Sequence, residues 1–218
     1  MLDRQSPALA AFVARHCGHA HTERERACSL YYAVRDQINY EIFNIAIDEE
    51  SLAPAHIIES SRGFCLHKAI LFASACRATG ISSRLLASRV RNHVSAPAIR
   101  KLVGGDIFMH WYTEILIEGN WLKVSPTFNR NLCRLYGLQA LDFDGHNDAV
   151  DHDNGDGTTM EYLATPSRFD APTHSELIEL IAAYHPHMVN SSLKVPPEKA
   201  FSENPQAGSY APNMAVKG

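Results

Sequence analysis

The sequence predicts a mixed fold of class α+β, in which helices pack against an antiparallel sheet. One stretch repeats its packed side chains at helical spacing, at Cys65, Ala69, Phe72, Cys76 and Thr79. A later stretch, residues 108–118, instead alternates between two faces, as a strand does, and residues 121–124 form a return strand. At 218 residues, the chain is long enough for one ordinary domain with its own core.

The segment before residue 65 is predicted to be largely helical. Residues 7–17 have helical spacing, and a second helix is expected over residues 22–38, where Thr22 and Glu25 form a capping box. Residues 39–43 are expected to be extended. Residues 44–62 are expected to form a long connection with one helical turn at 54–59.

Strands and shorter helices are predicted after the central helix, which ends at Gly80. We expect a strand over 82–90, a loop over 92–106, a short helix at 131–136 and an amphipathic helix at 174–184. The predicted organisation is a domain over residues 1–165 with its core at about 22–130, a C-terminal helix within 166–190, and a flexible tail over 191–218.

The predicted hairpin determines which side chains share a face of the sheet. One face would carry Trp111, Thr113, Ile115 and Ile117, and the other His110, Tyr112, Glu114 and Leu116. Gly119 and Asn120 suit a two-residue turn, which would set Asn129 opposite His110. Pro126 ends this pairing or confines it to a sheet edge.

Composition excludes several classes of function. The net charge is −4 and there is no run of Lys or Arg, so neither nucleic acid nor a membrane is expected as a partner. Residues 1–7 lack the apolar segment of a signal peptide. The five cysteines, an odd number without a CxxC pair, fit a reducing compartment. We therefore expect a cytoplasmic protein, and its oligomeric state stays open.

No cofactor or metal is predicted. Counted from Asp151, the acidic run has Gly155 at position 5, Asp156 at position 6 and Tyr162 at position 12. An EF-hand loop needs an oxygen ligand, Gly and Glu at these positions, so a hairpin turn is the better interpretation. The Cys and His residues show no CxxC or HxxxH spacing for a closed metal site.

Cys65 stands where a glycine-containing loop turns into the central helix. The free N–H groups and the positive dipole end of a helix N-terminus favour a thiolate, the nucleophilic form of cysteine. We therefore expect alkylating reagents to modify Cys65 selectively below about pH 7. The alternative is that Cys65 is a small buried apolar side chain, as many free cysteines are.

A thiol nucleophile needs a base within hydrogen-bond reach, and His110 is the candidate. A strand holds its side chain firmly, and the neighbouring Trp111 can exclude water. His67 lies about 200° round the helix from Cys65, and His93 lies in the predicted loop, so both are weaker candidates. Taken alone, His110 is also explained as a half-buried strand histidine.

Short motifs in a fixed order resemble the transglutaminase-like superfamily. They are G-F-C at residues 63–65, R-A-T-G-I-S-S-R at 77–84, H-W-Y-T-E at 110–114 and W-L-K-V-S-P-T at 121–127. Residues 34–40 also resemble the family's lead-in helix, so the resemblance covers roughly 22–130 and, more loosely, continues to about 165. It implies a papain-like α+β core with a nucleophile helix packed on an antiparallel sheet. Carried over by position, Cys65 would be the nucleophile and His110 the base.

The sequence departs from the family pattern at the third catalytic position. The family has Asp before Pro-Thr, and this chain has Ser125. An aspartate orients the imidazole and stabilises its positive charge, whereas a serine hydroxyl does only the first. Asn129 is an alternative third member, because papain-like proteases use Asn in this role. Asp142 and Asp144 are further alternatives.

The resemblance implies a cysteine-dependent acyl-transfer enzyme acting on a peptide or protein substrate. A thioester on Cys65 would pass its acyl group to water, as in a peptidase or amidase, or to an amine, as in a transglutaminase. Bacterial-type single-domain members look more like the hydrolases. The alternative is a catalytically weakened fold that binds a protein through the cleft or through residues 186–218. Ser125 favours this alternative, whereas the retained Cys65 and His110 oppose it.

Overall fold

A five-stranded antiparallel sheet forms the centre of the computed structural model, which describes residues 6–92, 97–150 and 160–190. The order is β5-β4-β3-β6, and β7 pairs with β3 on the same edge as β6. A separate parallel pair is formed by β1 and β2. The strands are β1 (Asn39–Tyr40), β2 (Arg62–Gly63), β3 (Ser83–Asn92), β4 (Ile107–Ile117), β5 (Asn120–Val124), β6 (Met160–Tyr162) and β7 (Ser167–Phe169).

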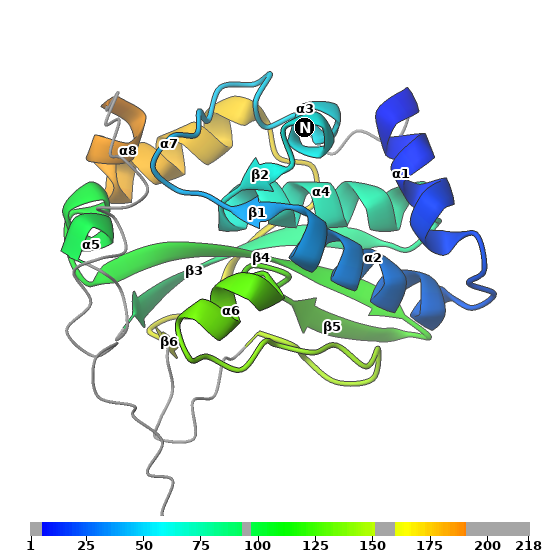
Figure 1. The fold of residues 1–218 in the computed structure, drawn as a ribbon. Helices are drawn as coiled ribbons and strands as arrows, with labels where there is room; N and C mark the ends of the chain where they lie inside the picture. Colours follow the sequence, from blue (N-terminus) through cyan, green and yellow to red (C-terminus); the bar gives the residue numbers. More distant parts are fainter. Residues whose placement is uncertain (1–5, 93–96, 151–159, 191–218) are drawn as a thin grey trace, which may run out of the picture.

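The central helix α4 lies along the sheet, with three further helices, α1 to α3, packed on it (Figure 1). α5 and α8 lie together at one end of the sheet (Figure 1). The helices are α1 (Pro7–Cys17), α2 (Glu23–Gln37), α3 (Pro54–Ser60), α4 (Cys65–Ala78), α5 (Pro97–Val103), α6 (Arg130–Leu135), α7 (His174–Tyr184) and α8 (Pro186–Asn190). Every side chain of α4 from Cys65 to Cys76 is buried, so this helix is the core of the domain.

Local signals in the sequence explain where most of these elements begin and end. The capping box at Thr22 is present and begins α2, and Thr173 forms a second one before α7. Gly80 follows α4 with φ +87°, the left-handed conformation that glycine adopts readily. The mixed helix and antiparallel-sheet class predicted from the sequence is confirmed.

The hairpin turn lies one residue earlier than predicted. Glu118 and Gly119 have positive φ values of 50° and 85°, and Asn120 already pairs with Ile117 in the ladder. A two-residue turn with positive φ at both positions matches the twist of the strands, and here Glu118 occupies the first position. Because β5 ends at Val124, the predicted register that set Asn129 opposite His110 is wrong.

The predicted loop over residues 92–106 is also wrong in part, because it contains α5. Pro97 is the first residue of this helix, a position at which proline needs no hydrogen bond, and Gly104 follows its end with φ +86°. The segment 166–190, predicted to hold a single C-terminal helix, contains the strand β7 and the helices α7 and α8. β7 joins the sheet, and Leu177 and Ile181 of α7 are buried in the core. The predicted tail at 191–218 and most of the acidic turn at 151–162 lie outside the described residues.

Two global features bear on function. The five cysteines are free thiols, and none of them is paired in a disulfide. Among the described residues, no helix combines the length and the apolar character that a membrane crossing requires.

Candidate active site

Cys65 is the first residue of α4, and the chain reaches it through a pair of short parallel strands. β1 and β2 pair so that Tyr40 lies opposite Gly63, and the Glu41 N–H donates to the Gly63 carbonyl at 3.1 Å. A Cβ on Gly63 would lie 2.5 Å from the His67 Cβ, closer than packed atoms approach. The glycine of the G-F-C motif therefore permits the tight turn that places Cys65 at the start of the helix.

The environment of the Cys65 sulfur favours the neutral thiol. Burial raises the pKa of the Cys65 thiol to about 11, although the N–H groups of Trp111 and Leu66 act in the opposite direction. Loss of hydration therefore opposes the thiolate that a helix N-terminus favours, and the thiolate expected from the sequence stays a prediction. Any nucleophilic role for Cys65 requires a base that removes its proton.

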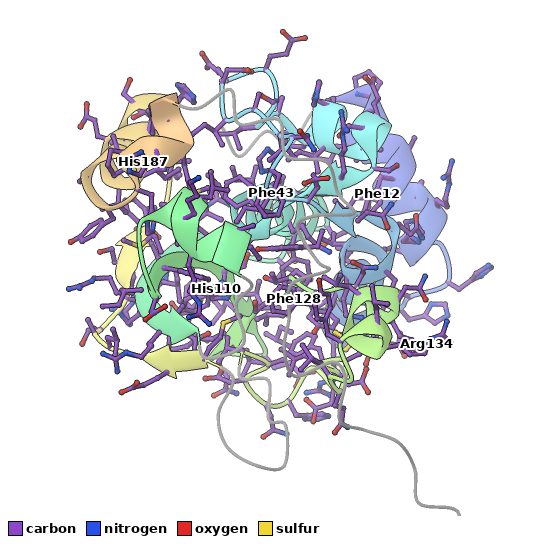
Figure 2. The ribbon with its side chains drawn as sticks, turned by 60° about the vertical axis from the view of Figure 1, so that its left-hand side comes forward. Phe12, Phe43, His110, Phe128, Arg134 and His187 are labelled. Atoms are coloured by element: carbon purple, nitrogen blue, oxygen red, sulfur yellow. The ribbon has the colours of Figure 1, made fainter. Side chains whose placement is uncertain are left out.

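Strand β4 brings His110 to the same place. The Trp111 N–H that favours a charge on the Cys65 sulfur belongs to the residue that follows His110. The Thr113 hydroxyl donates to the Ala69 carbonyl of α4 at 3.1 Å, which fixes the strand against the helix one turn beyond Cys65. His110 is buried, and its ring stacks on Tyr112 with 5.6 Å between centroids. His110 and Phe128, both labelled in Figure 2, line one pocket with Cys65.

Ser125 occupies the position from which a third residue can orient His110. Its hydroxyl lies 3.0 Å from His110 Nε2 and 2.9 Å from the hydroxyl of Thr127. Both serine and threonine are buried, and the Ser125 N–H donates to the Ala149 carbonyl at 2.8 Å. The hydroxyl pair is thus enclosed and held by the main chain. The Ser125 hydroxyl thus contacts Nε2, one of the two ring nitrogens of His110.

The other candidates for the third position lie elsewhere. Asn129 precedes α6, and its side-chain oxygen accepts the Tyr40 N–H at 3.3 Å. Asp142 forms an ion pair with Arg35 at 2.8 Å. Asp144 accepts the N–H groups of two following residues in an exposed turn. Of these candidates, Ser125 contacts His110. Asn129 instead contacts Tyr40 of β1, the short strand that pairs with the residues before Cys65.

His67, one of the two weaker base candidates, does not line the pocket of Cys65. His67 is buried, its Nε2 lies 3.0 Å from the Ala46 carbonyl, and burial lowers its pKa to about 4. His93 lies outside the described residues. Next to His67, the buried Lys68 donates to the carbonyl groups of Arg35 and Ile38 at 3.0 and 2.7 Å, so its amino group holds the end of α2 against α4.

The pocket at Cys65 is small and mostly apolar. It has a volume of about 40 Å³, and its walls come from segments far apart in the sequence. Its polar lining residues include Tyr40, Thr127 and His185, to which the sequence assigns no role in the site. Tyr40 lies in the lead-in motif, but no pattern distinguishes a pocket tyrosine from a core one. His185 follows α7 and carries no local signal at all.

Comparison with known proteins agrees with these observations. The family model of the transglutaminase-like superfamily matches residues 10–126, more than half of the chain. The chain belongs to the transglutaminase-like superfamily. A comparison with curated proteins gives no match.

Two solved structures are similar to this transglutaminase-like chain. A proposed cysteine protease of Cytophaga hutchinsonii is 18% identical, with a TM-score of 0.43 over 77% of this chain and 51% of its own. A proposed protease of Parabacteroides distasonis is 15% identical, with a TM-score of 0.39 over 56% of this chain and 23% of its own. This chain thus spans about half of the first structure and about a quarter of the second.

Several residues of the transglutaminase-like motifs build the scaffold of the site. Arg84 and Glu114 form an ion pair at 2.6 Å across β3 and β4, and the Arg84 guanidinium lies 4.0 Å from the Trp121 ring centre. Ser83, whose hydroxyl donates to the Ala73 carbonyl at 2.8 Å, ties β3 to α4. These contacts fix the hairpin on the helix. In the described ranges, no group of three or more His, Cys, Asp or Glu side chains is arranged to hold a metal ion.

Proposed function

We propose that this chain is a cysteine-dependent acyl-transfer enzyme, with Cys65 as the nucleophile and His110 as the base. The observation that carries the proposal is that Cys65 and His110 line one buried pocket, with the Trp111 N–H directed at the sulfur. A thiol, an imidazole and an orienting group in one enclosed site are the parts that covalent catalysis by cysteine requires. We further propose a peptide or protein amide as substrate.

The raised pKa of Cys65 determines the order of the proton transfers. Because the raised pKa favours the neutral thiol, His110 takes its proton as the sulfur attacks the carbonyl carbon. The carbonyl electron pair moves to oxygen, and a tetrahedral intermediate forms. His110 then gives the proton to the leaving amine, and the carbon–nitrogen bond breaks to leave a thioester on Cys65. Water or an amine then attacks the thioester carbon while His110 takes a proton from it. The carbon–sulfur bond breaks, the acyl group leaves, and the proton returns to the Cys65 sulfur.

Ser125 supports this cycle as a neutral positioning residue. The Nε2–H group of His110 donates a hydrogen bond to the Ser125 hydroxyl, which in turn donates to the Thr127 hydroxyl. This chain of hydrogen bonds fixes the plane of the imidazole and its tautomer. It adds no negative charge to stabilise the imidazolium, so we expect slower turnover than with an aspartate at this position.

Turnover of a small activated ester tests the proposal. Because the pocket is small, p-nitrophenyl acetate is a suitable acyl donor. We expect Cys65→Ala and His110→Ala to reduce p-nitrophenolate release to the background rate while melting temperatures stay unchanged. Cys28→Ala and His187→Ala, which change the same residue types outside the pocket, should keep the wild-type rate. Equal rates in all five proteins would contradict the proposal.

A second candidate function is a weakened member of the family that binds a protein. The neutral Ser125 beside His110 and the small pocket favour it. The same ester assay separates the two candidates. A wild-type chain without turnover, and without an acyl group on Cys65, would favour the binding function.

A further inference from the structure

Tyr40 is fixed beside Cys65 by main-chain contacts on both sides. It pairs with Gly63 in the parallel β1–β2 ladder, and the next residue, Glu41, donates its N–H to the Gly63 carbonyl at 3.1 Å. Gly63 stands two residues before Cys65. Strand β1, which carries Tyr40, is therefore hydrogen-bonded to the segment that leads into Cys65.

Two further residues hold Tyr40 in place. The Asn129 side-chain oxygen accepts the Tyr40 N–H at 3.3 Å, and the Phe128 ring packs edge-on against the Tyr40 ring with 5.0 Å between centroids. An asparagine at this position usually caps its own helix, but Asn129 makes no such bond to α6. The Asn129 side chain therefore does not cap α6, and its buried amide oxygen positions Tyr40 instead.

The hydroxyl of Tyr40 has no hydrogen-bond partner within the described part of the chain, although its ring lines the pocket with Cys65 and His110. Burial, and then the negative charge of a Cys65 thiolate, raise the pKa of Tyr40 well above its ordinary value. The phenol therefore stays protonated, and it is a free donor near the reacting sulfur.

We propose that the Tyr40 hydroxyl donates a hydrogen bond to the oxyanion that forms when Cys65 attacks an acyl carbon. This inference rests on the proposed function and adds to it. The first donor would be the Cys65 N–H at the start of α4, which is one of the unpaired N–H groups of a helix N-terminus. A hydrogen bond to this oxygen becomes stronger as the oxygen becomes negative, so the donor stabilises the transition state more than the bound substrate.

Two reactions of the same sulfur distinguish this role from thiol activation and from packing. In acylation by p-nitrophenyl acetate, the Cys65 sulfur forms a bond to the carbonyl carbon, and that carbon's oxygen carries the negative charge. Collapse of the intermediate expels p-nitrophenolate and leaves an acetyl thioester. In alkylation by iodoacetamide, the sulfur displaces iodide from a CH₂ group and no oxyanion forms. A donor to the oxyanion accelerates the first reaction only.

The experiment compares the wild-type chain, Tyr40→Phe and Tyr32→Phe at pH 9, with the label on Cys65 measured by peptide mass mapping. Tyr32 is the control because its hydroxyl donates to the Phe143 carbonyl on another part of the surface. We expect Tyr40→Phe to lower the acylation rate about 10²- to 10³-fold, as loss of one oxyanion donor does, while its alkylation rate equals that of the wild type. Tyr32→Phe should change neither rate.

A second variant checks the positioning role of Asn129 without removing the hydroxyl. Asn129→Ala should show the same selective loss of acylation, to a smaller extent, and Asn129→Asp should restore it, since a carboxylate also accepts the Tyr40 N–H. Unchanged acylation in Tyr40→Phe, or equal losses of acylation and alkylation, would overturn the inference alone. A wild-type chain that acquires no acetyl group on Cys65 would overturn the proposed function, and this inference with it.

Discussion

The Ser125 hydroxyl lies 3.0 Å from Nε2 of His110, in the place where the family pattern has an aspartate. The contact gives the imidazole a fixed orientation, and a second contact to Thr127 at 2.9 Å fixes the serine itself. Neither partner carries a charge. The arrangement therefore separates two functions that an aspartate combines, orientation of the base and stabilisation of its positive charge.

Substitution of Ser125 tests whether the missing charge limits turnover. Ser125→Asp should raise kcat/KM for p-nitrophenyl acetate by more than about tenfold, up to a limit of ~10⁴ set by the loss when a charged orienter is removed. Ser125→Ala should lower it roughly tenfold, the value of one hydrogen bond. Ser125→Asn is the matched control, because it has the shape of Asp without the charge, and it should give no gain. A gain with Asn equal to that with Asp would show that charge is not the limiting factor.

The pH dependence of stability should depend on His185. This buried histidine accepts the Met109 N–H at Nε2 and donates from Nδ1 to the Val103 carbonyl, each at 2.8 Å, and the bond at Nε2 requires the neutral ring. Burial lowers the pKa of His185 below its ordinary value. The unfolded chain then binds more protons than the folded one as the pH falls through about 6.5, so acidification destabilises the fold.

Urea unfolding between pH 8 and pH 5 measures this effect. The wild-type free energy of unfolding should fall with decreasing pH. His185 contributes a slope of at most about 1.4 kcal/mol per pH unit, and His67, whose pKa burial lowers to about 4, adds its own contribution. His185→Gln keeps an uncharged acceptor and should show a smaller slope. His187→Gln, in which an exposed neighbour is changed, should follow the wild type. The same slope in all three proteins would exclude His185 as the titrating group.

Two substitutions in the loop before Cys65 should have opposite effects on stability. Gly63→Ala places a methyl group 2.5 Å from the His67 Cβ and should lower the free energy of unfolding by about 1–3 kcal/mol. Ser61→Gly relieves a left-handed residue with φ 51° and should raise it by about 0.5–1 kcal/mol. Thermal and urea unfolding measure both. A stable Gly63→Ala protein would mean that the loop can move away from α4.

Alkylation of Cys65 should be slow at neutral pH. Because burial raises the pKa of Cys65 to about 11, the rate of reaction with iodoacetamide should increase about tenfold for each pH unit between 7 and 10. This is the opposite of the selective labelling below pH 7 that the sequence alone suggests. Peptide mapping of the five cysteines measures it. A rate plateau below pH 7 would indicate a thiolate–imidazolium pair with His110 in the resting protein.

The sequence predicts the scaffold of the site well, because local signals fix it. The spacing after Cys65 gives the length of α4, and the alternation around His110 gives β4. Both Ser125 and Asn129 are candidates for the third catalytic position from the sequence, which does not distinguish between them. That choice depends on the hairpin register, and the register changes when Glu118 rather than Asn120 enters the turn.

The remaining features depend on tertiary contacts that leave no local pattern. The raised pKa of Cys65 results from burial by several segments, which outweighs the N–H groups near the sulfur. Tyr40 approaches Cys65 through a ladder of only two residue pairs, and His185 reaches Met109 from 76 residues away. Short parallel strands and long-range histidine contacts produce no periodic pattern in the sequence, so they cannot be predicted from it.

The most direct test of the account is the fate of Cys65 in the first turnover of p-nitrophenyl acetate. Rapid mixing at pH 8 should give a burst of p-nitrophenolate, and peptide mapping of acid-quenched samples should find one acetyl group per chain, on Cys65. His110→Ala should abolish both the burst and the acetyl group. Acetylation spread over the five cysteines, or an acetyl group on Cys65 that forms as fast without His110, would contradict the account.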